Sequence, residues 1–188
     1  MPNTLKILGI PGSLRKASLN LGLLRAAREL APEGTSVEIF ALEGIPPFNQ
    51  DDESRLPARI VELKTKVREA DALIFATPEY NYSVPGVLKN AIDWGSRPYG
   101  DNVWTGKPVA IMGASPGSLG TARAQYHLRQ TLVCLDMHPL NKPEVLIGQA
   151  AAKFDAAGNL TDEDTRKHIR KLLDALAAWT RQLGRAQS

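Results

Sequence analysis

Small, hydroxylated and basic side chains are concentrated in Gly12–Asn20, directly after the apolar stretch Leu5–Ile10. Hydroxyl, amide and guanidinium groups of this kind can hydrogen-bond a terminal phosphate. A helix follows at once, and its N-terminus adds free N–H groups and the favourable end of the helix dipole. The segment therefore predicts an anion site, whose candidate cofactor-binding residues are Ser13, Arg15, Ser18, Leu19 and Asn20.

Simpler explanations exist for single residues of this segment. Ser18 or Asn20 could act only as the N-cap of the helix, and Arg15 could be a solvated surface charge. Their concentration after a buried strand favours ligand binding. The chain contains neither G-x-G-x-x-G after its first strand nor G-x-x-x-x-G-K-[ST] anywhere, so the usual dinucleotide and P-loop patterns are absent. The segment is therefore expected to bind the phosphate of a mononucleotide.

Two further loops of interest follow apolar stretches. One comes after Ala72–Thr77 and supplies aromatic rings, an amide and backbone N–H groups suited to a flat, polar heterocycle. The other comes after Val109–Gly113 and supplies glycines and hydroxyls that let the backbone lie against such a ring. These residues could instead only shape turns or pack against other groups. The candidate cofactor-binding residues of the two loops are Pro78, Glu79, Tyr80, Asn81, Tyr82, Ser115 and Gly117.

Five apolar strands alternate with five amphipathic helices along the chain. This alternation predicts an α/β fold with a three-layer, doubly wound parallel sheet in the order 2-1-3-4-5, whose switch point lies between the first and third strands. The three candidate loops would then meet at the carboxyl edge of the sheet. The predicted strands are Leu5–Ile10, Ser36–Phe40, Ala72–Thr77, Val109–Gly113 and Glu144–Ile147.

Apolar spacing and capping residues predict the helices. The segment Ala41–Asp52 is expected to be a loop. The expected helices are one carrying Leu23 to Ala31, one over about 56–70, one capped by Ser83 and ending near Trp94, one over about 121–135, and a last one whose capping box starts at Thr161.

The 188 residues are 43% hydrophobic and 23% charged, which suits one domain, 1–188, with a substantial core. The net charge of +3 comes from scattered basic residues, and this distribution argues against nucleic-acid binding. No apolar stretch reaches the roughly 20 residues of a membrane helix, and the first residues lack the pattern of a signal peptide. We therefore expect a cytoplasmic protein without a membrane partner.

The residues that most often bind metals are sparse. Cys134 is the only cysteine, so no internal disulfide can form, and its apolar neighbours predict a small buried side chain. The spacing of His127, His138 and His168 matches no metal motif. The sequence therefore predicts no metal site.

The segments Gly12–Asn20, Pro78–Asn81 and Leu88–Trp94 closely resemble the NADPH-dependent FMN reductase family, which includes flavoproteins of the chromate reductase and quinone reductase type. The pattern G-S-x-R-x-x-S-x-N followed by P-E-Y-N is specific, and the resemblance runs along nearly the whole chain. It implies a flavodoxin-like fold, a tightly bound FMN and usually a dimer or tetramer. By this resemblance, the FMN phosphate is held by Ser13, Arg15, Ser18 and Asn20, the ribityl chain and isoalloxazine ring are lined by Pro78–Asn81, and the flavin is also contacted by Ser115.

If FMN is bound, the flavin carries the chemistry and no catalytic side chain is required. We therefore expect a ping-pong oxidoreductase in which NADPH or NADH reduces the flavin and a small-molecule acceptor then takes the electrons. Candidate acceptors are quinones, azo dyes, free flavin and chromate. Arg15 could alternatively bind the phosphate of NADPH.

Two other functions remain open from the residues alone. One is an electron carrier of the flavodoxin type, which serves protein partners and is usually acidic, whereas this chain is mildly basic. The other is a nucleotide-binding module without turnover. Turnover of NADPH with a quinone would distinguish the reductase from both.

A homodimer or homotetramer is expected from the resemblance, and two aromatic segments are candidate subunit contacts, because aromatic residues are enriched at interface cores. Both segments could instead pack within one chain. They are the loop with Trp94, Tyr99 and Trp104, and the helix with Arg123, Tyr126 and Gln130.

Overall fold

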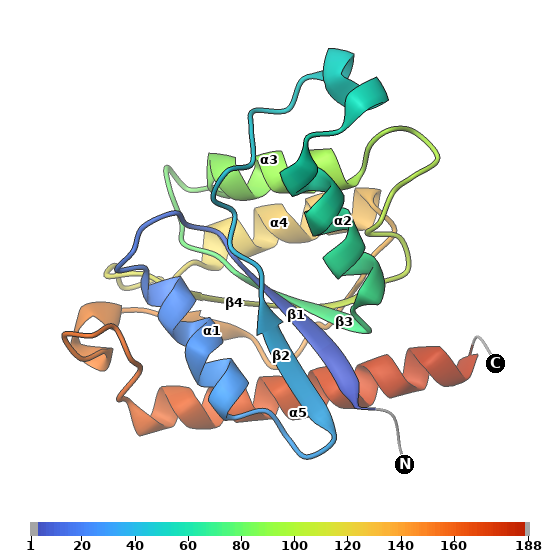
Figure 1. Cartoon of the computed structure of the whole chain (residues 1–188). Coiled ribbons are helices and arrows are strands. Elements are labelled where there is room, and N and C mark those ends of the chain that lie inside the picture. Colours follow the sequence, from blue (N-terminus) through green and yellow to red (C-terminus); the bar gives the residue numbers. More distant parts are fainter. Residues whose placement is uncertain (1–3, 187–188) are drawn as a thin grey trace.

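A parallel β-sheet lies between two layers of helices in the computed structural model, which describes residues 4–186 (Figure 1). The strand order is β2-β1-β3-β4-β5, with β6 also paired to β4, and every paired strand is parallel. This is the predicted flavodoxin-like order. The strands are β1 (Leu5–Pro11), β2 (Thr35–Ile39), β3 (Ala72–Ala76), β4 (Pro108–Ala114), β5 (His138–Pro139) and β6 (Val145–Ile147).

The helices divide between the two faces of the sheet (Figure 1). One face is covered by α1 (Leu19–Glu29) and α5 (Glu163–Ala186), and the other by α2 (Ala58–Glu69), α3 (Gly86–Gly95) and α4 (Ala122–Cys134). Two short 3-10 helices, η1 (Gln50–Arg55) and η2 (Ala150–Lys153), lie in connecting segments. The first of them begins at the end of the segment predicted as a loop.

The side chains of the central strands alternate between two hydrophobic cores. On β1, Leu5 and Ile7 pack with α1 and α5, whereas Leu8 and Ile10 pack with α2 and α3. Every residue of β3 is fully buried. Burial on both faces explains why this strand reads as a continuous apolar run rather than an alternating one.

The last part of the sheet differs from the prediction of one strand at Glu144–Ile147. Two short strands pair with β4 in turn: β5 with Pro108–Val109, and β6 with Met112–Ala114. Proline has no backbone N–H and does not fit a continuous ladder, and this edge carries Pro139 and Pro143. The edge is therefore split, with β6 where the strand was predicted.

The prediction that Ser83 caps α3 was wrong. The helix begins at Gly86 after Pro85, without a side-chain cap. A residue that precedes proline is held in extended backbone, so the helix cannot start earlier. Ser83 instead pairs with Tyr80 across a tight turn.

The last helix is capped one residue later than predicted. The Oδ2 atom of Asp162 accepts the Thr165 N–H at 3.4 Å and the Thr165 hydroxyl at 3.2 Å. The Thr161 hydroxyl donates instead to the Lys153 carbonyl at 3.2 Å. Asp162 is therefore the N-cap of α5.

Burial corrects two further expectations. Cys134, the last residue of α4, is exposed rather than buried, because the face of the helix that packs on the sheet carries Leu128 and Leu132. Trp94 and Trp104 are fully buried within the chain, so that of the three aromatic residues in that candidate contact loop only Tyr99 is exposed. No helix among residues 4–186 is long and apolar enough to cross a membrane.

Candidate functional site

The loops after β1, β3 and β4 meet at the carboxyl end of the sheet, beside the switch point (Figure 1). They enclose one cleft, which contains most of the predicted cofactor residues. Asn81, Tyr82 and Gly117 lie outside its lining, whereas Ala114 and Pro116 line it without having been predicted. The lining residues are Ser13, Arg15, Ser18, Leu19, Asn20, Pro78, Glu79, Tyr80, Ala114, Ser115 and Pro116.

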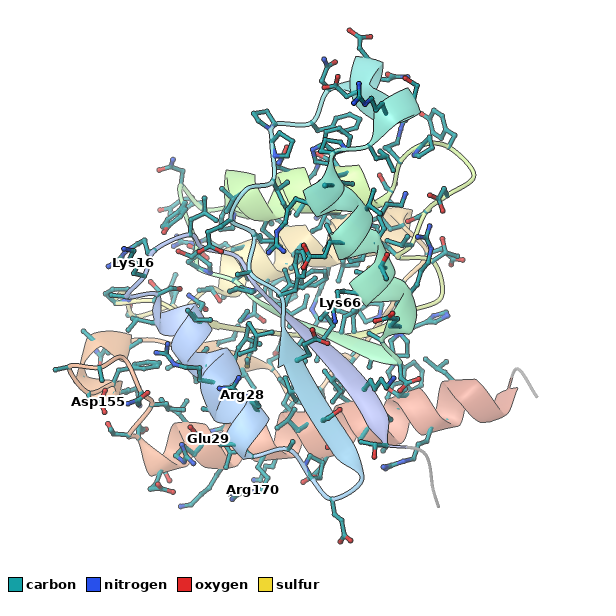
Figure 2. All side chains as sticks on the ribbon, viewed as in Figure 1. Lys16, Arg28, Glu29, Lys66, Asp155 and Arg170 are labelled. Atoms are coloured by element: carbon teal, nitrogen blue, oxygen red, sulfur yellow. The ribbon has the colours of Figure 1, made fainter. Side chains whose placement is uncertain are left out.

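The loop after β1 has the donors of an anion site. Ser18 is the N-cap of α1, and its Oγ accepts the Leu21 N–H at 3.3 Å. The Oγ of Ser13 accepts the Arg15 N–H at 3.2 Å, so both hydroxyl protons remain to be donated elsewhere. The first turn of α1 carries no acidic residue. Arg15 and Lys16 are both exposed, and Figure 2 shows Lys16 near the start of α1. Ser18 is thus both a helix cap and a candidate phosphate ligand.

Asn20 lines the cleft and also makes a contact within the chain that was not predicted. Its Nδ2 donates to the Ala114 carbonyl at 3.0 Å, and its Oδ1 accepts the Ala114 N–H at 2.9 Å. The side chain is buried, and these two bonds join the first turn of α1 to the end of β4. Asn20 therefore fixes the distance between two walls of the cleft.

The loop after β3 contains a tight two-residue turn. Tyr80 and Ser83 exchange backbone hydrogen bonds of 3.1 and 2.9 Å, and between them Asn81 has φ 50° and Tyr82 has φ 66°. Left-handed backbone at a bulky residue costs about 1–3 kcal/mol and is concentrated at functional sites. The N–H groups at the centre of such a turn do not pair across it and are available to a ligand.

Glu79 points away from the turn toward α4. Its Oε1 accepts the Arg123 Nε–H at 2.5 Å, and its Oε2 accepts the Ala124 N–H at 3.1 Å. Burial disfavours the charged carboxylate, but these bonds outweigh the burial and hold the pKa of Glu79 below its usual value. The carboxylate therefore stays ionised and is paired with the Arg123 guanidinium.

The loop after β4 is anchored to the end of β6 and to the segment that follows it. The Ser115 N–H donates to the Ile147 carbonyl at 2.9 Å, and the Ala150 N–H donates to the Ser115 carbonyl at 3.1 Å. Gly120 has φ 61°, and a Cβ there would lie 2.9 Å from the carbonyl carbon of Leu146. Glycine is thus required at this position, and the third wall of the cleft is rigidly held.

A larger hollow of about 690 Å³ lies at the opposite end of the sheet, near the start of β1 and the ends of α2 and α5. Lys107 lies in its wall and donates to the Ala70 carbonyl at 2.6 Å and to the Arg68 carbonyl at 3.2 Å. Helix C-termini present carbonyl groups and the negative end of the dipole. Within the described part of the chain, this hollow therefore lacks the helix N-terminus that the cleft has.

The donors of the cleft fit FMN. Two hydroxyls, a guanidinium and the start of α1 suit a phosphate, and an uncharged turn with free N–H groups suits the polar edge of the ring. Within residues 4–186 no three histidine, cysteine or acidic side chains are grouped to hold a metal ion. A flavodoxin-like sheet with such a site at its switch point defines the class of FMN-binding flavoproteins.

Comparison with known proteins agrees with this class. The model of the NADPH-dependent FMN reductase family matches residues 5–152. An NAD(P)H-dependent FMN reductase of Pseudomonas aeruginosa is 54% identical over 97% of this chain and 99% of its own. A 2-hydroxy-1,4-benzoquinone reductase of a Burkholderia species is 46% identical over 94% of this chain and 97% of its own.

A solved structure adds the same relationship in three dimensions. FerB, a flavoenzyme NAD(P)H:(acceptor) oxidoreductase from Paracoccus denitrificans, superposes with a TM-score of 0.86 at 38% identity, over 95% of this chain and 98% of its own. The chain therefore belongs to the NADPH-dependent FMN reductase family. It is an oxidoreductase with FMN as cofactor and NAD(P)H as substrate, as its motifs implied.

Proposed function

We propose that this protein reduces quinones by a ping-pong cycle, in which NADPH or NADH reacts in the cleft and leaves before the acceptor enters. The observation that carries the proposal is that an anion-binding helix start and Pro78–Tyr80, the segment that leads into the strained turn, line the same cleft. Quinones are the favoured acceptors because the relatives include quinone reductases at 44% and 46% identity. Azo dyes, free flavin and chromate are further candidates.

The residues of the cleft bind and orient rather than react. The phosphate of FMN would be held by the Ser13 and Ser18 hydroxyls, the Arg15 guanidinium and the first amides of α1. Asn20 would act by holding the walls together, and the Asn81 and Tyr82 amides would face the ring. When bound, FMN supplies a two-electron carrier. No side-chain acid, base or nucleophile is then required.

Arg15 has two possible ligands, the phosphate of FMN and that of NADPH, and the replacement Arg15→Ala separates them. Loss of FMN from the purified variant supports the first role. A raised KM for NADPH with FMN retained supports the second.

The experiment that tests the proposed function is anaerobic reduction of the purified protein, followed in its visible spectrum. The spectrum of bound FMN should bleach on addition of NADPH or NADH and return on addition of a quinone. Double-reciprocal plots of the initial rate against NADPH, recorded at several fixed quinone concentrations, should give parallel lines if the order is ping-pong. A flavin that stays oxidised would refute the reductase and favour a flavodoxin-type carrier that needs a partner.

We also propose that residues 1–188 act as one FMN-binding domain in a cytoplasmic homodimer or homotetramer. The outward face of α4 is a candidate contact, because Tyr126 and Val133 are 55% and 70% exposed one above the other on this helix. Buried aliphatic and aromatic side chains stabilise most subunit interfaces. Sedimentation that finds only monomers would exclude this proposal.

A further inference from the structure

The carboxylate of Glu79 belongs to the loop that lines the cleft but contacts another element. Its side chain is only 5% exposed, and both of its oxygens bind the first turn of α4, through Arg123 and the Ala124 N–H. A carboxylate at this position gains both the ion pair and the positive end of the helix dipole. Glu79 is therefore an N-terminal cap of α4 supplied from a distant part of the chain.

Arg123 joins both sides of the tight turn. Its guanidinium hydrogen-bonds Glu79, which precedes the turn, and lies 3.6 Å from the centre of the Tyr82 ring, which belongs to it. A planar guanidinium can donate along its edge and stack on an aromatic ring with its face, whereas an ammonium group cannot do both in this geometry. One side chain thus holds two points of the same loop.

The turn needs such support because its backbone is strained. Asn81 and Tyr82 are both left-handed, and such conformations persist only where the surroundings fix them. A further contact from α4 is made at the last residue of the turn, where the His127 Nδ1 is 3.1 Å from the Ser83 Oγ. The turn is therefore held against the first two turns of α4.

We propose that Glu79 and Arg123 are positioning residues for the flavin: their pair fixes the Tyr80–Ser83 turn on the N-terminus of α4, so that the turn presents its free N–H groups to the ring. This role rests on the binding of FMN in the cleft. Neither side chain contacts the reacting atoms. The pair instead determines how well the turn fits the ring and how the flavin is oriented.

Three variants test the proposal, with Asp162→Asn as a matched control. Asp162 also caps a helix and also pairs with a basic side chain, Lys153, at 3.0 Å, but it lies outside the cleft lining. Glu79→Gln removes the negative charge of the pair. Arg123→Lys keeps the positive charge but loses the planar guanidinium. The third variant combines the two changes. Each apoprotein is titrated with FMN by quenching of flavin fluorescence, and the circular dichroism of the bound flavin and the urea denaturation curve are recorded.

Glu79→Gln and Arg123→Lys should each weaken FMN binding by about tenfold or more and change the flavin dichroism, since each loses charge-assisted hydrogen bonds that hold the turn. The control should lower stability to a similar extent but bind FMN within about twofold of the wild type. The double variant Glu79→Gln/Arg123→Lys should bind little worse than either single one, because both changes break one interaction.

Two results would overturn the proposal, and they differ. If the wild type binds FMN but the two variants match the control in affinity and dichroism, the pair serves only stability. If the wild type binds no FMN, the proposed function fails and this role fails with it. Where Glu79→Gln is too unstable to titrate, Arg123→Lys decides between the outcomes.

Discussion

Replacing Asn20 by aspartate changes one polar group at the joint between two walls of the cleft. The Oδ1 atom can still accept the Ala114 N–H, now at 2.9 Å. The second oxygen of the introduced carboxyl would face the Ala114 carbonyl oxygen, to which the Nδ2 now donates at 3.0 Å. Two acceptors then meet in a buried site where the wild type has a hydrogen bond.

The expected cost follows from the burial and the lost donor. Burial without a hydrogen-bond donor raises the pKa of a carboxyl. A rise of about two units corresponds to a loss of about 3 kcal/mol of stability once the group is ionised. The protonated carboxyl can still donate to the Ala114 carbonyl, so the cost at low pH is only about 1 kcal/mol. Stability of Asn20→Asp should therefore be lost as pH rises through the elevated folded pKa and be retained below the ordinary carboxyl pKa near 4.

Urea denaturation of the variant and the wild type between pH 4 and 8 measures this difference. The deficit should grow from about 1 kcal/mol at pH 4 to about 4 kcal/mol at pH 7, and FMN binding should weaken in parallel. Asn102→Asp is the control. Its Oδ1 accepts the Trp104 N–H at 3.0 Å, and its Nδ2 donates to the Thr105 hydroxyl at 2.9 Å, which can reverse its role, and only at 3.4 Å to the Leu135 carbonyl, at a half-buried position. A deficit for Asn20→Asp that is below 0.5 kcal/mol, or that does not change with pH, would refute the assigned role of this joint.

Three further results are expected. Gly113→Ala should lower the free energy of unfolding by about 2 kcal/mol or more, since its Cβ would collide with a threonine hydroxyl and a backbone carbonyl. Gly86→Ala is the control, because a Cβ there would have nothing within 4 Å and should not lower the stability. Thermal melts compare the two variants. Lys64→Met should cost about 2–4 kcal/mol in urea denaturation, because the buried Lys64 amino group binds the carbonyl and the carboxylate of Asp101, both at 2.8 Å; equal stability would contradict this. Hydrogen bonds from a lysine and from α5 outweigh partial burial and hold the pKa of Asp162 below its usual value. The stability it contributes is present above the ordinary carboxyl pKa and lost as pH falls through the lowered one, so Asp162→Asn should flatten the acid part of the stability curve.

The architecture could be predicted because its determinants are local. Apolar runs such as Ala72–Thr77, small residues at strand ends and helical spacing each occupy a few neighbouring positions. Parallel strands joined by helices can then be arranged in few ways, which brought the three candidate loops together. The split of the last strand near Pro139 and Pro143 was not predicted, because it depends on which backbone N–H groups can pair with the neighbouring strand β4.

The roles of single side chains in the site could not be predicted in the same way. Asn20 bonds a residue 94 positions away, and Glu79 bonds residues 44 and 45 positions away. Their residue types suit a phosphate or ring ligand as well as they suit a contact within the chain. Which partner they bind depends on the groups that the fold brings within hydrogen-bonding distance. Cys134 was misjudged for a related reason, since its apolar neighbours do not show which face of α4 turns outward.

The most direct test of the account compares FMN with riboflavin, which lacks the phosphate, in fluorescence titrations of the apoprotein. The account places that phosphate on the Ser13 and Ser18 hydroxyls, the Arg15 guanidinium and the start of α1. Two or more charge-assisted hydrogen bonds should make FMN bind at least about 100-fold more tightly than riboflavin. Equal affinity for the two flavins would show that the loop after β1 does not hold the phosphate and would contradict the central claim.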